Sequence, residues 1–138
     1  MQIYYNQLDS KLKDNLKPIY IIAGSEIYQE EICLQKIIKT AKKASFFDHE
    51  VIYVEKSFDW DSFNSSNSNL SLFSSKKIIE LRFLTKSVGI TAEKKILEII
   101  ENFSQDNLII IRLPELKAAD FKKKYLGIKN SNVGLIRI

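Results

Sequence analysis

The 138-residue sequence contains one cysteine, one histidine and no long apolar run. The single Cys33 cannot form an internal disulfide, which agrees with a reducing compartment. One histidine and one cysteine are also too few for a zinc site of the usual kind. No apolar run approaches the roughly 18 residues that a membrane span needs, and Met1–Asn6 lacks the basic start of a secretory signal. We therefore expect a cytoplasmic protein.

The sequence also lacks the residues of a nucleotide site. The first apolar segment ends in Gly24-Ser25-Glu26 before a predicted helix, where a phosphate-binding loop would stand. The pattern GxxxxGK[ST] requires a second glycine, a lysine and a hydroxyl, but the chain continues to Glu30 and Glu31, whose carboxylates would repel a triphosphate. No predicted strand end carries the acidic pair that would hold Mg²⁺. We expect no catalytic residue, no metal and no cofactor.

Three other residues that could have a functional role are instead interpreted as structural. His49 follows Asp48 ahead of a predicted strand, and we expect the two to form a surface pair. Cys33 lies within a predicted helix and is expected to be a small core residue. Trp60 follows Asp59 at the start of a short predicted helix and is expected to pack that helix onto the sheet.

Composition and charge indicate an ordinary globular domain with a mild positive charge. Apolar residues make up 45% of the chain and charged residues 28%, and the net charge is +4. The length fits one domain with a real hydrophobic core. Lysines gather in two predicted helices, and they are interpreted as solvated faces or as a weak basic surface that tolerates DNA. A DNA-binding module therefore stays open as an alternative function.

Apolar segments of strand length alternate with segments of helical period. The predicted strands are Ile19–Gly24, Glu50–Val54, Lys77–Leu84, Leu108–Leu113 and Val133–Ile138. A first predicted helix begins near Asn6 and carries Leu8, Leu12 and Leu16, and a second covers Glu26–Ala44. A short helix follows the Asp59 cap. A fourth helix is capped by Thr91 and buries Ile96, Leu97, Ile100 and Phe103, and a fifth covers Lys117–Leu126. This alternation predicts an α/β domain with a mostly parallel sheet between helices.

The most informative segment is the pentapeptide Asn69-Leu70-Ser71-Leu72-Phe73. It closes a Ser/Asn-rich run that begins at Ser62 and precedes the predicted strand at Lys77. Large apolar side chains at the end of a polar segment are typical of a surface offered to a partner. The alternative is that Leu70, Leu72 and Phe73 pack beneath the following strand. The string also resembles QL[SD]LF, by which bacterial replication proteins bind the sliding clamp, with Asn69 in place of Gln.

The order of elements and motifs resembles the delta subunit family of the bacterial DNA polymerase III clamp loader, in its N-terminal domain. The resemblance covers nearly the whole chain. It rests on four stretches in order: Leu16 to Glu26, Phe58-Asp59-Trp60, Ser71 to Leu81, and Leu108 to Ile111 with Pro114-Glu115-Leu116. The Ser-Leu-Phe step followed by a basic pair and an apolar strand is the most telling of them.

The resemblance implies an AAA+-like, P-loop NTPase-like Rossmann-type domain with a degenerate nucleotide site. The five predicted strands would form its sheet. If they are numbered along the chain, the analogy with AAA+ domains implies the order 5-1-4-3-2. Residues 1–17 would be a helical lead-in and residues 18–138 the α/β core of one N-terminal domain. The last predicted strand ends at the last residue, so we expect a longer protein whose helical lid and oligomerisation collar domains are absent from this chain.

The resemblance also implies a function and a site. The expected protein is a non-catalytic subunit of a complex with DNA-directed DNA polymerase activity. It would bind and open the beta sliding clamp beside the gamma/tau and delta prime subunits, touching DNA only weakly. Leu72 and Phe73 would form the hydrophobic wedge with Leu70 as a helper, and Ser71 and Asn69 complete the clamp-binding residues. A nucleotide-binding domain with an atypical phosphate loop at Gly24–Tyr28 is an alternative.

Overall fold

The computed structural model describes residues 2–24, 26–63, 76–104, 106–115, 119–120, 125 and 132–138. These residues form a six-stranded sheet in the order β1-β6-β2-β5-β4-β3, in which the strands pair in parallel. The strands are β1 (Gln2–Ile3), β2 (Ile19–Ala23), β3 (Asp48–Val54), β4 (Lys77–Phe83), β5 (Asn107–Arg112) and β6 (Val133–Arg137). The helices are the 3-10 turn η1 (Tyr5–Gln7), α1 (Leu8–Asp14), α2 (Ile27–Lys43) and α4 (Ile90–Glu101), and residues 60–63 are also helical.

The α/β class and the order of the five predicted strands are confirmed. The predicted order corresponds to β6-β2-β5-β4-β3, which is the order found. The strand number is wrong by one, because Gln2 and Ile3 pair in parallel with Leu135 and Ile136 of β6 and add an edge strand. The expected lead-in is thus partly a strand. Two residues are too few to show a period-2 pattern, and their partner lies at the other end of the chain.

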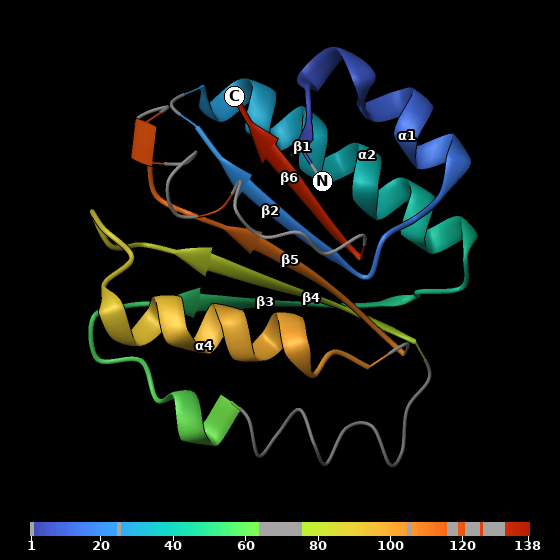
Figure 1. Ribbon diagram of the computed structural model, residues 1–138. Coiled ribbons are helices and arrows are strands. Elements are labelled where there is room, and N and C mark those ends of the chain that lie inside the picture. The colour runs from blue at the N-terminus through green and yellow to red at the C-terminus, as the bar shows by residue number, and fades with distance from the viewer. Residues whose placement is uncertain are drawn as a thin grey trace.

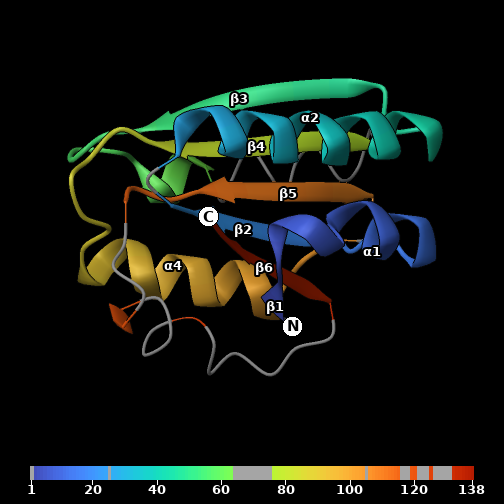
Figure 2. The same ribbon diagram turned by 90° about the horizontal axis from the view of Figure 1, so that it is seen from above.

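Two apolar layers enclose the sheet. Helices α1 and α2 pack on one face and α4 on the other, as the two views show together (Figure 1, Figure 2). Cys33 of α2 is fully buried, as predicted. Strand β2 is buried at all five positions, and such two-sided burial explains why the central strands are nearly continuous apolar runs.

Two helix starts differ from the sequence-based predictions. Helix α4 begins at Ile90 after Gly89, whose φ of 83° favours glycine, so Thr91 is not the cap. Its buried face includes Ala92 and Ile99, whereas Leu97 is 48% exposed. At the N-terminus a 3-10 turn precedes α1, so Asn6 lies within that turn instead of capping the helix. The predicted helix Lys117–Leu126 falls mostly outside the described residues.

Candidate functional site

The five predicted clamp-binding residues lie outside the described part of the chain. These are Asn69, Leu70, Ser71, Leu72 and Phe73, within the interval 64–75. Their assignment therefore stays a prediction from sequence. The structure does describe both boundaries of this interval, at Phe63 and at Lys76.

The N-terminal boundary is a capped helical turn held by an aromatic cluster. Asp59 caps the turn as predicted, since its Oδ1 accepts a hydrogen bond from the Ser62 N–H at 3.1 Å. The Trp60 ring lies 4.8 Å from that of Phe58 and 6.0 Å from that of Phe63, both in edge-on or T-shaped contact. It also lies 6.4 Å from the ring of Phe83 in β4, which confirms that Trp60 packs this turn onto the sheet.

The C-terminal boundary is the start of β4. The Lys76 ammonium group donates a hydrogen bond to the Ala44 carbonyl oxygen at 3.2 Å. Lys77 forms an ion pair with Glu50 of the neighbouring strand β3. Three consecutive residues of β4, Ile78 to Glu80, are then fully or almost fully buried. The interval 64–75 is thus attached at both ends to well-packed parts of the domain.

The end of β2, where a phosphate loop would stand, is closed by backbone packing. The Ile138 N–H donates to the Ala23 carbonyl oxygen at 2.8 Å. A side chain at Gly24 would place its Cβ 2.3 Å from the Ile138 carbonyl oxygen. The contact with Ile138 therefore accounts for glycine at this position without a phosphate ligand.

Carboxylates occupy the first turns of α2. Glu30 is only 6% exposed, and its burial raises the pKa of the carboxyl group; Arg112 offsets part of this effect, while Glu31 and Glu115 add to it. The Arg112 guanidinium donates to Glu31 Oε1 at 3.0 Å. Acidic side chains near the N-terminus of a helix interact favourably with the helix dipole, but they would repel a polyphosphate, as the sequence indicated.

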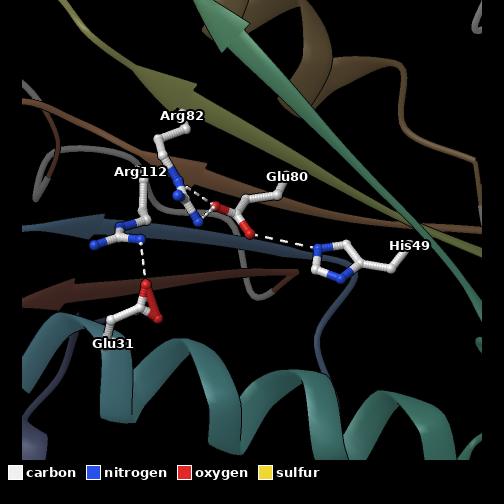
Figure 3. A network of polar contacts seen from close by, with 5 residues as sticks. All are labelled: Glu31, His49, Glu80, Arg82 and Arg112. Atoms are coloured by element: carbon white, nitrogen blue, oxygen red, sulfur yellow. Dashed lines mark hydrogen bonds and ion pairs between the residues drawn. The ribbon is translucent and has the colours of Figure 1, made fainter.

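A second polar group lies inside the sheet (Figure 3). Glu80 is fully buried, and its Oε2 accepts from Arg82 Nε at 2.7 Å and lies 2.6 Å from Arg82 Nη2. His49 Nε2 lies 3.4 Å from Glu80 Oε1, which accepts no hydrogen bond from a described residue. His49 thus lies within β3 and faces Glu80, so its predicted placement in a loop before the strand is wrong. The expected surface pair with Asp48 stays a prediction.

The described contacts of the Glu80 carboxyl group are with basic side chains. The described partners of Glu80 are two cationic or potentially cationic side chains, and Arg82 also lies 5.7 Å above the Tyr53 ring. Within the described residues, no group of three or more His, Cys, Asp or Glu side chains is arranged to hold a metal ion. None of the described helices is long and apolar enough to cross a membrane.

Comparisons with known proteins agree on one family. The family model "DNA polymerase III, delta subunit" matches residues 20–133. DNA polymerase III subunit delta of Buchnera aphidicola subsp. Schizaphis graminum is 29% identical over 126 residues, which cover 91% of this chain and 37% of that protein. The Escherichia coli K12 subunit delta is 21% identical over 134 residues, covering 96% of this chain and 39% of that protein.

A solved structure supports the same fold. The Bacillus subtilis DNA clamp loader delta protein superposes with a TM-score of 0.65 at 14% sequence identity, covering 97% of this chain and 42% of that one. The chain spans between 37% and 40% of the length of the curated relatives it matches. Because the family model covers most of the sequence, the chain belongs to the DNA polymerase III delta subunit family.

Proposed function

We propose that this chain is the clamp-binding domain of a delta subunit and that Leu72 and Phe73 enter a pocket on the beta sliding clamp. Leu70 assists them, and Ser71 and Asn69 complete the contact. The observation that carries the proposal is the pentapeptide itself, in a chain of this family. The packing of Trp60 and the hydrogen bond of Lys76 support it, because both residues that flank the interval are attached to the domain.

The energetics of a two-residue wedge suit this role. Burying a Leu and a Phe contributes about 1.5–3 kcal/mol each. This is enough for measurable binding. The clamp ring opens only if the wedge binds the open form more tightly than the closed form. The affinity difference between the two forms therefore sets how far the ring opens.

The domain acts within a larger assembly in this proposal. The relatives are more than twice as long, so contacts with gamma/tau and delta prime subunits include parts of the protein beyond this chain. The acidic start of α2 and the closed end of β2 agree with an AAA+-like domain that has lost its nucleotide site. ATP hydrolysis then belongs to neighbouring subunits, and DNA synthesis to the polymerase that they serve.

Clamp opening can be measured directly with a sliding clamp carrying a self-quenching dye pair across one subunit interface. Addition of the chain is expected to raise the fluorescence as the interface separates, and Leu72→Ala with Phe73→Ala is expected to abolish the rise. The matched control is Ile27→Ala with Tyr28→Ala, which truncates two large side chains that are 73% and 78% exposed at another site. A fluorescence rise that survives the Leu72/Phe73 change would refute the assigned wedge.

A further inference from the structure

One end of the sheet displays an exposed aromatic ring among lysines. Phe47 is 72% exposed, and Lys42, Lys43 and Lys76 are exposed beside it in sequence or space. We call Lys42, Lys43, Phe47 and Lys76 the amino-end patch, because they lie where β3 and β4 begin and α2 ends. Figure 1 shows these three element ends together on the right of the sheet.

A defined backbone turn precedes Phe47. Helix α2 ends with Ser45 in the left-handed region, at a φ of 75°. The Phe46 N–H donates to the Ala41 carbonyl oxygen at 3.0 Å and the Ser45 N–H to that of Lys42 at 3.2 Å, which is the Schellman motif. This motif buries Phe46, which is 8% exposed. Phe47, the next residue, lies exposed directly before β3.

Lys76 joins this helix end to the start of β4. Its ammonium group bonds to the Ala44 carbonyl oxygen at 3.2 Å and lies 5.2 Å above the centre of the Phe46 ring. In the parallel pair of β3 and β4, Asp48 is in register with Lys77, so Phe47 and Lys76 precede adjacent strands that lie about 4.8 Å apart. Phe47 and Lys76 are therefore neighbouring positions at the same end of the sheet.

The charge of the patch is positive. Among the described residues, the ion pairs include neither Lys42 nor Lys43. These two lysines also line a shallow hollow of about 400 Å³ with Lys39 and Ile38. The carboxylate of Glu50 at the same end is paired with Lys77. An acidic partner surface would complement this arrangement.

The patch lies close to the proposed wedge along the chain. Lys76 follows Phe73 by three residues. Chain connectivity therefore keeps their Cα atoms within at most about 11 Å. A partner that receives Phe73 must come near Lys76 and the residues around it.

We propose that the amino-end patch is a second contact on the sliding clamp, in which Phe47 enters an apolar spot and the lysines face carboxylates around it. The inference rests on the proposed function. An exposed aromatic anchor within a charged rim is the usual composition of a protein–protein contact. A nucleic acid fits less well, because a single aromatic ring gives no series of stacking platforms.

The test is clamp affinity measured by surface plasmon resonance at several salt concentrations. Phe47→Ala is expected to weaken binding by about tenfold or more, the scale of an interfacial aromatic anchor. Lys42→Glu with Lys43→Glu is expected to slow association and to flatten its salt dependence. The matched controls are Tyr28→Ala, another exposed ring, and Lys86→Glu with Lys94→Glu, which make the same charge change on exposed lysines elsewhere. Both controls are expected to bind like the wild type.

The outcomes separate this inference from the proposed function. If the wild type binds, Leu72→Ala/Phe73→Ala abolishes binding, and the patch variants bind like the wild type with an unchanged salt slope, the patch is not a contact while the proposed function stands. If the folded wild type binds no clamp, the proposed function fails and the inference fails with it. Loss of affinity for a short single-stranded DNA, with clamp affinity unchanged, would assign the patch to nucleic acid and overturn the inference.

Discussion

Two nitrogens of Arg82 contact the same oxygen of Glu80: Nε lies 2.7 Å and Nη2 2.6 Å from Oε2. The Glu80 side chain has no solvent exposure. Breaking a buried ion pair from one side leaves an uncompensated charge, whereas replacing both partners by apolar groups is often neutral. The pair therefore makes separable predictions for single and double substitutions.

Arg82→Met is expected to lower the free energy of unfolding by about 3 kcal/mol, near the low end for a buried pair because Arg82 itself is 30% exposed. The double variant Glu80→Leu with Arg82→Met should recover most of that loss. Urea unfolding of the wild type and the variants measures both values. If the double variant loses as much free energy of unfolding as Glu80→Leu and Arg82→Met lose in sum when each is made alone, the two side chains are not coupled.

Glu30 makes stability depend on pH. Burial raises the pKa of its carboxyl group in the folded protein, so the folded state holds the proton more tightly than the unfolded chain. Stability from this group is then present below the unfolded pKa, about 4.3, and is lost as pH rises through the interval up to the raised pKa. Glu30→Gln is expected to stabilise the protein at pH 7 and to have little effect at pH 4.

Urea unfolding at pH 4 and pH 7 checks this expectation for Glu30. Glu26→Gln is the matched control, since it removes the same charge from an exposed position at the same helix end. An equal change in stability at both pH values for Glu30→Gln would contradict the assigned origin of the shift.

Ser45 occupies a conformation that glycine adopts more easily, with a φ of 75°. Ser45→Gly is expected to raise the free energy of unfolding by about 0.5–1 kcal/mol, after the entropy cost of glycine is subtracted. Ser45→Val should lower it, because a β-branched residue is strained at positive φ. Thermal unfolding distinguishes the two, and equal stability of both variants would show that this turn is not strained.

The chain is expected to bind no ATP. The end of β2 is closed by the Ile138 backbone, and Glu30 and Glu31 lie in the first turns of α2. A ligand that binds the folded state raises the melting temperature by mass action. Millimolar ATP with Mg²⁺ should therefore leave the melting temperature unchanged relative to Mg²⁺ with sulfate of equal ionic strength. A concentration-dependent rise with ATP would favour the atypical phosphate loop instead.

The central architecture was predictable because its signals are local. Strands β2 and β5 are continuous apolar runs, which two-sided burial in a parallel sheet requires. The Asp59 cap and the packing of Trp60 followed from adjacent residues as well. The resemblance to a known family supplied the strand order, which periodicity does not determine.

The features that were missed depend on distant parts of the chain. Strand β1 exists only because β6 lies beside Gln2 and Ile3. The contact of His49 with Glu80 needs the register of β3 against β4, which no local pattern specifies. Phe46 and Phe47 are chemically identical and both follow the turn at Ser45 that ends α2, yet Phe46 is buried and Phe47 is exposed. The pentapeptide at Asn69–Phe73 remains a prediction from sequence.

The most direct test of the account is a calorimetric titration of this chain against the purified sliding clamp of the same organism. The wild type is expected to bind, and Leu72→Ala with Phe73→Ala, folded by circular dichroism, is expected to lose measurable binding, while Ile27→Ala with Tyr28→Ala binds as before. Undiminished affinity in the Leu72/Phe73 variant would contradict the account, because it would show that these two side chains do not bind the clamp.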